Sequence, residues 1–251
     1  MKIIYETHGR AREYFELAAN LYLGCGHACG YCYGPDVLHM TPATFFKDPR
    51  PRKDVIRKLV QDAADLAVLG EKRPILLCFV TDPYQPLDEK LQLTRQAIEV
   101  LKGKGLSVAI LTKGGRRAMR DLDLLGPGDQ FGTTLTFIFE EERKQWEPGA
   151  APFLERIESL KAAKDRGIRT FVSLEPIFDY EAAAEIILEY HALVDFWKVG
   201  KLNYLDQAKA VDWQAAALKL LATLKKVKAA GYLKKDLAQY IGKPEGILVR
   251  K

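Results

Sequence analysis

Residues 18–34 read AANLYLGCGHACGYCYG and contain an apolar run followed by a loop with three cysteines. The run at 18–23 has the length of a β-strand. Cys25, Cys29 and Cys32 follow it within eight residues, in a loop that is otherwise rich in glycine. Glycine lets a backbone wrap closely around a bound group. The stretch therefore predicts a strand whose end carries a thiol-rich binding loop.

Five further apolar runs of strand length follow along the chain, and several are rich in Val, Ile, Leu and Phe, as strands covered on both faces are. These runs are 75–80, 107–111, 131–136, 169–174 and 196–200. Helical patterns separate them, so strand and helix alternate six times, which predicts an α/β fold with a parallel sheet. Right-handed crossovers can wind such a sheet into an open layer or curl it into a partial barrel, and periodicity does not choose between the two.

Apolar residues three and four positions apart mark the helices between the runs. The main stripes lie in 55–66, 93–101, 153–160, 183–190 and 213–227, and a weaker one lies in 118–125. Four glycines stand where helices are expected to stop, because glycine readily adopts the left-handed conformation that ends a helix. They are Gly70, Gly105, Gly167 and Gly231.

The composition is that of a globular protein. Hydrophobic residues make up 48% and charged residues 28% of the 251, which excludes disordered, collagen-like and purely coiled-coil proteins. No linker or low-complexity tract divides the chain, so we expect a single domain over residues 1–251. The net charge of +5 is compatible with an anionic partner without requiring one.

The start of the chain gives no sign of export. Residues 1–15 are rich in charge and lack the apolar core of a secretory signal. No apolar run approaches the ~18 residues of a membrane-spanning helix. These features predict a cytoplasmic protein with no membrane partner, and in a reducing compartment a cysteine triplet is a metal site rather than a disulfide framework.

Polar groups follow all six apolar runs. They are the cysteine loop, Thr81-Asp82, Thr112-Lys113-Gly114, the threonines of 133–136, Glu175-Pro176 and the polar residues of 198–203. Ligands of parallel α/β folds bind beyond the carboxyl ends of the strands, so we expect these groups to converge on one mouth. The ordinary polarity of loops accounts for part of the same pattern.

The cysteine triplet has two main interpretations. Three thiolates can hold three irons of a [4Fe–4S] cluster and leave the fourth iron open to a ligand. Alternatively, the triplet binds zinc with His27 or His39 as fourth ligand. An inert group of buried thiols is the weakest interpretation, because a glycine-rich loop is a poor core segment.

The pattern Cys25-x3-Cys29-x2-Cys32, with an aromatic residue before the last cysteine, resembles the signature of radical S-adenosylmethionine (SAM) enzymes. The resemblance is closest to the branch that includes spore photoproduct lyase and "DNA repair photolyase"-like proteins. The segments that look like this branch are Tyr31-Cys32-Tyr33, Thr81-Asp82-Pro83, Thr112-Lys113-Gly114 and Glu147-Pro148. It implies a partial (β/α)6 TIM-like barrel of parallel strands over about 18–203, followed by a C-terminal helical segment at 204–251.

The resemblance also implies the cofactors. Cys25, Cys29 and Cys32 would ligate a [4Fe–4S] cluster that binds SAM at its open iron. An electron from a flavodoxin-like or ferredoxin-like partner then cleaves the S–C5′ bond, and the 5′-deoxyadenosyl radical takes a hydrogen atom from the substrate. The matching cofactor-binding positions are Tyr31, Thr81, Asp82, Lys113, Thr134, Thr136 and Glu175.

Several of these positions also have a structural interpretation. Asp82, with Thr81, matches the position that meets the SAM amino group, but an Asp before Pro is also a turn former. Lys113 matches the position that meets the SAM carboxylate, but it is also a plausible solvated loop residue. Thr134 and Thr136 are candidates for the ribose hydroxyls and are also ordinary strand residues.

Tyr33 is our catalytic candidate, because it matches a tyrosine implicated in radical transfer in spore photoproduct lyase. That enzyme also carries a hydrogen-donor cysteine two residues before its Ser-Asp pair, and Phe79 stands at the matching position here. Cys78 is one residue away, and adjacent strand residues face opposite sides. We therefore expect Cys78 to be a buried core residue rather than the donor.

The substrate is a hypothesis from the same resemblance: a nucleic-acid base or nucleotide. Basic clusters occur at 47–53, at 116–120 just beyond Lys113, at 225–228 and at 234–235, and the second of them is placed to meet phosphates. The C-terminal lysines are expected on a solvated helix face. Two alternatives are a non-catalytic metal-binding interaction module and a radical enzyme that acts on a protein or peptide.

Overall fold

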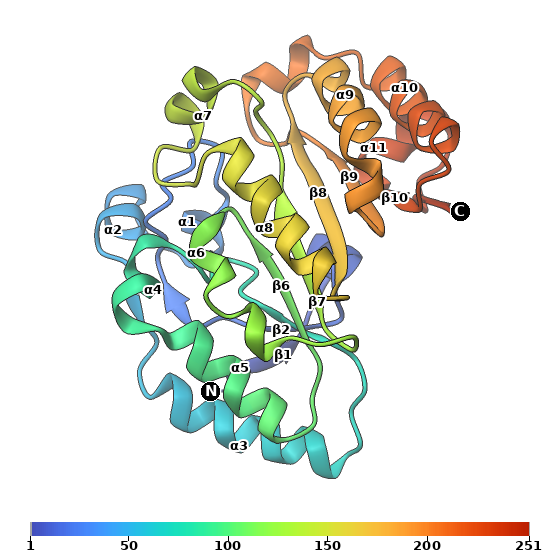
Figure 1. Cartoon of the computed structure of the whole chain (residues 1–251). Coiled ribbons are helices and arrows are strands. Elements are labelled where there is room, and N and C mark those ends of the chain that lie inside the picture. The colour runs from blue at the N-terminus through green and yellow to red at the C-terminus, as the bar shows by residue number, and fades with distance from the viewer. Residues whose placement is uncertain (1, 251) are drawn as a thin grey trace.

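A computed structural model describes residues 2–250. Its main sheet has nine strands in the order β1-β2-β5-β6-β7-β8-β9-β10-β11 (Figure 1). The strands are β1 (Ile4–Glu6), β2 (Leu17–Ala19), β5 (Ile75–Leu77), β6 (Val108–Thr112), β7 (Gln130–Thr134), β8 (Arg169–Ile177), β9 (Phe196–Lys201), β10 (Gly231–Leu233) and β11 (Ile247–Val249). Strands β2 and β5 to β9 are the six predicted runs, and each pairs in parallel with its neighbour. The α/β fold with a parallel sheet is confirmed.

The first two runs are shorter in the sheet than their apolar sequences. Strand β2 ends before Asn20, and the next apolar residues form β3 (Tyr22–Leu23), which pairs with β4 (Arg50–Pro51) in a separate ribbon. The side-chain oxygen of Asn20 accepts hydrogen bonds from the backbone N–H groups of Phe79 and Val80, at 2.9 and 3.1 Å. These N–H groups are therefore not available for pairing with a neighbouring strand, and β5 ends at Leu77.

The five strongest helical patterns are confirmed as α3 (Val55–Val68), α5 (Leu93–Gly103), α8 (Phe153–Asp165), α9 (Tyr180–Tyr190) and α10 (Trp213–Lys226). The weaker pattern is the short α6 (Arg116–Met119) with a 3-10 turn after it. Further short helices are α1 (Gly34–Val37), α2 (Pro42–Lys47), α4 (Pro86–Leu91), α7 (Glu140–Trp146) and α11 (Lys235–Ala238).

Three of the four predicted helix-stop glycines adopt positive φ, namely Gly70, Gly105 and Gly167. The fourth prediction was wrong. Lys228, with φ 52°, takes the left-handed position after α10, and Gly231 begins β10. A methyl group on Gly231 would lie 3.0 Å from the carbonyl oxygen of Trp197 on β9, so close strand pairing is what requires glycine there.

Two apolar layers lie on opposite faces of the sheet. Ile75 and Leu77 belong to the large core between sheet and helices, while Leu76 between them belongs to a second cluster with Tyr14, Phe15 and Phe171. Alternation along each strand sends neighbouring side chains to the two faces. The second cluster fills the inside of a curved sheet, as in a barrel.

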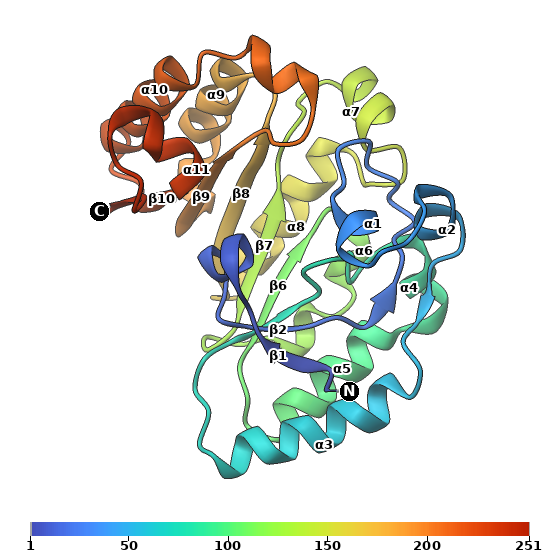
Figure 2. The same cartoon turned by 180° about the vertical axis from the view of Figure 1, so that it is seen from behind.

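The N-terminal segment closes the open side of this sheet. The architecture is therefore the partial barrel and not the open layer. Residues Gly9–Glu13 form a 3-10 helix that lies over the concave face (Figure 2). Glu13 Oε1 accepts hydrogen bonds from the Tyr232 hydroxyl and from the backbone N–H of Lys235, at 2.9 and 3.0 Å. Lys198 on β9 donates to the carbonyls of Glu13 and Tyr14. The two edges of the curved sheet are thus joined by a non-strand segment.

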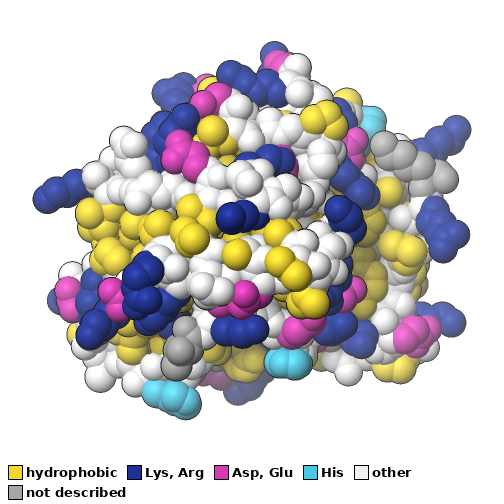
Figure 3. Space-filling view, turned by 90° about the horizontal axis from the view of Figure 1, so that it is seen from below, with side chains coloured by type: hydrophobic (Ala, Val, Ile, Leu, Met, Phe, Trp, Pro, Cys, Tyr) yellow, Lys and Arg dark blue, Asp and Glu magenta, His cyan; other side chains and the backbone are white. Residues whose placement is uncertain are grey.

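The C-terminal segment differs from the helical prediction for 204–251. It contains α10 and α11 but also strands β10 and β11, which extend the sheet by two. Over the part of the chain that the structure covers, we find no helix with the length and hydropathy to span a bilayer. One surface, seen from below in Figure 3, carries basic and acidic side chains interspersed with apolar ones.

Candidate active site at the mouth of the barrel

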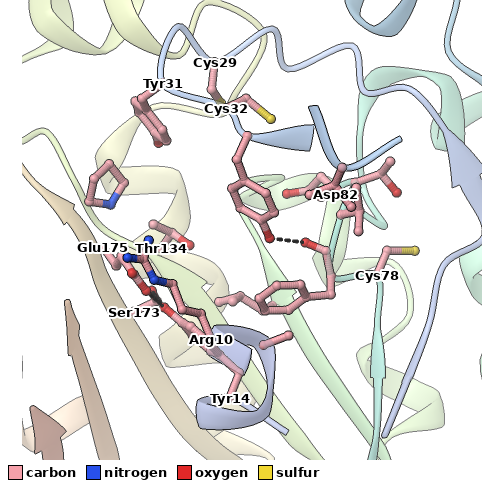
Figure 4. Close-up of a pocket in the computed structure, with 18 of the residues that line it drawn as sticks. Arg10, Tyr14, Cys29, Tyr31, Cys32, Cys78, Asp82, Thr134, Ser173 and Glu175 are labelled. Carbon is pink, nitrogen blue, oxygen red and sulfur yellow. Dashed lines mark hydrogen bonds between the residues drawn. The ribbon is translucent and has the colours of Figure 1, made fainter. Parts of the chain in front are cut away.

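A cavity of about 710 Å³ opens at the carboxyl ends of the strands. Residues from Tyr5 near the start of the chain to Lys234 near its end line it. Most of the predicted site residues meet there: Cys25, Cys29, Tyr31, Cys32, Tyr33, Thr81, Asp82, Lys113, Thr134 and Glu175. Figure 4 shows Cys29 and Cys32 at one end of the cavity and Tyr14, Ser173 and Glu175 at the other.

Thr136 is the exception among the predicted residues. Strand β7 ends at Thr134, so the alternation that would bring Thr136 to the same face does not continue. Thr136 is not among the residues of the cavity wall, and its hydroxyl is buried without a hydrogen-bond partner in the described structure. The structure therefore separates the two threonines.

The cysteine loop is held in place by backbone hydrogen bonds from two sides. Cys25 donates its N–H to the carbonyl of Phe45, at 2.9 Å. On the other side, Gly30 donates to the carbonyl of Trp146 and Gly149 donates to the carbonyl of His27, at 2.8 and 3.0 Å. A methyl group on Gly149 would lie 2.2 Å from the carbonyl oxygen of Gly26, so glycine is required for this contact. The loop has a fixed conformation before any group binds.

The thiols fit a cluster better than a single zinc ion. Burial raises the pKa of the Cys29 thiol to about 12, so these thiols lose their protons only when a metal binds. Cys32 Sγ accepts the backbone N–H of Gly34 at 3.3 Å, which stabilises a thiolate. Within residues 2–250, no three His, Cys or acidic side chains gather closely enough to ligate one ion. A [4Fe–4S] cluster instead binds each cysteine at a different iron.

His27, an alternative zinc ligand, is already committed to other contacts. It is buried, and its Nδ1 lies 3.3 Å from Asp82 Oδ2, while Arg117 Nη2 donates to its Nε2 at 2.8 Å. Burial lowers the pKa of His27, which fits a neutral ring that donates on one side and accepts on the other. The other zinc candidate, His39, is exposed. Neither histidine is placed as a fourth ligand.

Asp82 acts on its surroundings rather than presenting a free carboxylate. Its Oδ1 accepts from the Thr112 hydroxyl at 2.6 Å and from the N–H of Tyr84 at 2.8 Å. Its Oδ2 accepts from the N–H of Lys113 at 2.7 Å and faces His27. A carboxylate has about four lone-pair positions, and all are used. The predicted role of Asp82 toward an ammonium group stays a prediction; in the structure, its carboxylate joins the cysteine loop to the ends of β5 and β6.

Thr81, beside Asp82, belongs to the cavity wall. Its hydroxyl oxygen is buried and has no hydrogen bond of good geometry within the described residues, but it interacts with the Cys78 thiol and partly offsets the rise in the pKa of that group that burial causes. Buried hydroxyls normally have a partner, and for Thr81 this partner is the Cys78 thiol.

A buried ion pair supports Tyr31 and Lys113. Glu147 accepts from the Tyr31 hydroxyl and from Arg156 Nη2, the latter at 2.5 Å. Arg156 also donates to the carbonyl of Thr134 at 3.0 Å. Lys113 Nζ lies 5.5 Å from the Tyr31 ring centroid, and burial, opposed by the charges of Cys29 and Glu147, leaves its pKa raised. Lys113 is thus a partly buried cation at the cavity wall, next to the Tyr31 ring.

Sequence reasoning missed the residues at the far wall. Lys234 was expected on a solvated face, but it is 2% exposed and donates to both Glu175 oxygens, at 2.8 and 2.6 Å. The Tyr14 hydroxyl donates to Glu175 Oε2 at 2.6 Å and shares a hydrogen bond with Ser173 Oγ at 2.6 Å. No sequence motif identifies Tyr14 or Lys234. Both reach the end of β8 only because the N-terminal segment and the segment after β10 meet there in the folded protein.

Tyr33 stands between the two ends of the cavity. Its hydroxyl donates to the carbonyl of Phe79 at 3.3 Å, and the Phe79 ring lies 6.2 Å from the Tyr33 ring and 5.6 Å from the Tyr14 ring. Cys78 borders the cavity but is 3% exposed, and its sulfur accepts the N–H of Leu21 at 3.3 Å. Figure 4 shows that sulfur pointing away from the other labelled side chains.

The basic cluster beyond Lys113 is not free to meet phosphates. Arg116 pairs with Glu158 at 2.6 Å. Arg120 pairs with Asp88 and Asp121, at 2.8 and 2.7 Å. Arg117 donates to His27 and to backbone carbonyls. This cluster has a structural role around the cysteine loop.

Comparison with known sequences gives one family. The profile of the Radical SAM superfamily matches residues 19–187. An uncharacterized protein of Methanocaldococcus jannaschii is 26% identical over 187 residues, which cover 73% of this chain and 69% of that protein. An uncharacterized protein of Mycobacterium bovis is 28% identical over 176 residues, which cover 65% of this chain and half of that protein.

Solved structures share the fold. A variant of spore photoproduct lyase matches 96% of this chain and 75% of its own, with a TM-score of 0.65 at 15% identity. Spore photoproduct lyase complexed with dinucleoside spore photoproduct has a TM-score of 0.64 at 17% identity, and the match covers 91% of this chain and 68% of that one. The radical SAM methyltransferase TsrM from Kitasatospora setae, with cobalamin and a [4Fe–4S] cluster, has a TM-score of 0.54 at 14% identity, over 73% of this chain and 36% of that one.

Proposed function

Because the chain belongs to the radical SAM superfamily and is a radical SAM enzyme, we propose that its cavity holds a [4Fe–4S] cluster with SAM at one end and a hydrogen-donating substrate at the other. When bound, such a cluster would supply the one electron needed to cleave the S–C5′ bond of SAM into methionine and a 5′-deoxyadenosyl radical, and this radical would abstract a hydrogen atom from the substrate. One observation carries the proposal: three cysteines, Thr81 and the partly buried Lys113 share one cavity wall.

The residues of this wall have separate tasks. Cys25, Cys29 and Cys32 would hold three irons. Lys113 would bind the SAM carboxylate, since a partly buried ammonium is a strong partner for an anion. Thr81 would accept a hydrogen bond from the SAM amino group. Their tasks are supported by position and charge at the cavity.

Three other residues complete the cofactor side. Asp82 would orient Lys113 through its backbone N–H and the cysteine loop through His27. Thr134, at the end of β7, is the candidate for a ribose contact, and Tyr31 would pack beside the cofactor. Tyr33 would transfer a hydrogen atom between the two ends of the cavity, because it stands between them.

The far wall supports a compact substrate with a flat ring and a polar edge, and a nucleobase or nucleotide is the proposed class. Tyr14, Tyr33 and Phe79 offer aromatic faces for stacking. Ser173, Glu175 and the Tyr14 hydroxyl form the polar edge of this wall and are hydrogen-bonded to one another. Acidic and basic side chains are mixed around the whole cavity, which does not favour binding of a long nucleic-acid strand. They are Glu6, Asp82, Glu175, Arg10, Lys113, Lys201 and Lys234.

Two other functions have weaker support. A zinc-binding interaction module would need a histidine ligand, and His27 makes two other contacts. A radical enzyme that oxidises a peptide through an auxiliary cluster would need more cysteines, and beyond the triplet the chain has only Cys78.

Anaerobic reconstitution tests the proposal. We expect a brown protein with about four irons per chain that forms 5′-deoxyadenosine from SAM after reduction with dithionite. The Cys29→Ala variant should lose both iron and product. The Cys78→Ala variant is the matched control and should retain both. A colourless zinc protein, or a loss of iron from both variants alike, would overturn the proposal.

A further inference from the structure

A basic segment, residues 47–58, wraps the outer side of the cysteine loop. It runs from the end of α2 through β4 into the first turn of α3. Figures 1 and 2 both place it along one edge of the molecule, at the opposite side from α10. It contains six Lys or Arg and two Asp, a net charge of +4 in a chain whose total is +5.

This segment touches the cysteine loop directly. Arg50 pairs with Leu23, two residues before Cys25, in the β3–β4 ribbon. A methyl group on Gly24 would lie 3.1 Å from Pro49 Cα, and one on Gly26 would lie 3.9 Å from the Pro49 ring. The segment is therefore adjacent to the proposed cluster ligands in space as well as in sequence.

Part of the positive charge of the segment is available to a partner. Arg50 pairs with Asp48 at 2.7 Å and Arg57 pairs with Asp54 at 3.2 Å, and both pairs lie within the segment. Lys47 and Lys53 are exposed and have no acidic partner within 4 Å among residues 2–250. Among the same residues, no salt bridge joins the segment to the rest of the protein, so its net charge is not offset from outside.

The segment faces away from the substrate. No residue between Val37 and Cys78 lines the cavity. A ligand in the cavity and a partner on the segment would therefore approach the cysteine loop from opposite sides. A surface that is near the cysteines and apart from the substrate is suited to delivering electrons.

We propose that this segment is the docking surface for an acidic one-electron carrier protein, which reduces the cluster from outside the barrel. The inference rests on the proposed function. Electron-transfer encounters are small and transient, and complementary charge sets their association rate more than it sets their affinity. A compact patch of +4 beside the ligand loop meets that requirement. An oligonucleotide is the competing partner. Because no residue of the patch lines the cavity, an oligonucleotide bound there would not be held at the proposed substrate site.

Charge reversal tests the docking surface. The variant Lys47→Glu/Arg50→Glu/Lys53→Glu should form 5′-deoxyadenosine at least about tenfold more slowly with reduced flavodoxin at low salt. With dithionite, a small reductant, its rate and iron content should equal those of the unmodified enzyme. The control Lys225→Glu/Lys226→Glu/Lys228→Glu makes the same charge change at the end of α10 and should match the unmodified enzyme with both reductants.

An unchanged rate with flavodoxin in the triple variant would overturn the inference. If that variant also loses binding to a duplex oligonucleotide, the segment is a nucleic-acid surface instead. If the triple variant does not fold, the unmodified enzyme still decides: salt must slow the flavodoxin-driven rate and leave the dithionite-driven rate unchanged. Failure of the proposed function gives a different result, because dithionite then forms no 5′-deoxyadenosine. In that case the docking surface is tested by titrating flavodoxin into the iron-loaded protein and measuring binding directly.

Discussion

Lys234 Nζ holds both oxygens of Glu175, at 2.8 and 2.6 Å, across 59 residues of sequence. The lysine side chain is 2% exposed and the glutamate side chain 17%. This pair ties the segment after β10 to the end of β8, at the wall of the cavity farthest from the cysteines.

Removing one partner of this pair should be costly. In Lys234→Met, the Glu175 carboxylate keeps only the Tyr14 hydroxyl as a donor, and we expect unfolding to require about 3 kcal/mol less free energy in urea titrations. The double variant Lys234→Met/Glu175→Gln should recover part of that loss, because no uncompensated charge remains. The single variant Glu175→Gln gives the reference. If the losses in unfolding free energy of the two single variants simply add in the double variant, Lys234 and Glu175 are not coupled and the prediction is wrong.

Gly149→Ala should displace the cysteine loop. The added methyl would lie 2.2 Å from the carbonyl oxygen of Gly26, so the segment 146–149 and the loop must move apart at a cost of about 1–3 kcal/mol. We expect a lower iron content after reconstitution, measured by metal analysis. Gly126→Ala is the control, because nothing lies within 4 Å of its added methyl, and it should keep the full iron content.

His27→Gln should keep its iron. Both ring nitrogens of His27 are used by Asp82 and Arg117, so the side chain positions the loop and does not ligate metal. We expect full iron content with a loss of stability of about 1–3 kcal/mol from the hydrogen bonds that glutamine cannot reproduce. Release of metal from this variant would instead favour the zinc interpretation, in which His27 is the fourth ligand.

Lys198 should give stability a pH dependence that Lys198→Met lacks. Burial, together with the charge of Lys234, lowers the pKa of Lys198 to about 7. Between pH 7 and the ordinary pKa range of lysine, the unfolded chain binds a proton that the folded chain does not. The free energy of unfolding should therefore rise with pH over this window, by up to about 1.4 kcal/mol per pH unit.

The measurement compares Lys198→Met with the unmodified protein in urea titrations from pH 6 to 10. The difference between them should be constant below about pH 7 and should change steadily above it. A difference that is constant over the whole range would mean that Lys198 remains charged in the folded protein at all these pH values.

Sequence predicted the six parallel strands and the position of the cysteines and Thr81 at the mouth formed by their carboxyl ends. The alternation of apolar runs and helical stripes predicts β2 and β5 to β9 with the main helices, because each burial pattern has its own period. The cysteines and Thr81 follow strand ends directly, so topology alone brings them together. Tertiary hydrogen bonds then shift the ends of the strands. Asn20, for example, follows the last residue of β2, and its side chain binds the backbone N–H groups just beyond β5.

The far end of the site was not predictable in the same way. Tyr14 reaches Ser173 across 159 residues, through closure of the barrel by a segment with no strand pattern. Arg156 lies on the buried stripe of α8, where an apolar residue is the usual occupant, and only its pairing with Glu147 explains it. The contacts of Asp82 join three segments, because Tyr84 is in its own loop, Thr112 and Lys113 end β6, and His27 is in the cysteine loop, and no motif records this combination.

The contact of Glu13 with Tyr232 and Lys235 also sets an order of events during synthesis. The residues it joins are 219 and 222 positions apart, so these two hydrogen bonds form only after residue 235 has been made. The strands from β2 to β9 can pair before that point, because all of their partners precede it in the chain. The wall that carries Tyr14 can dock on Ser173 and Lys198 earlier, and the contacts of Glu13 with Tyr232 and Lys235 are the last to join it.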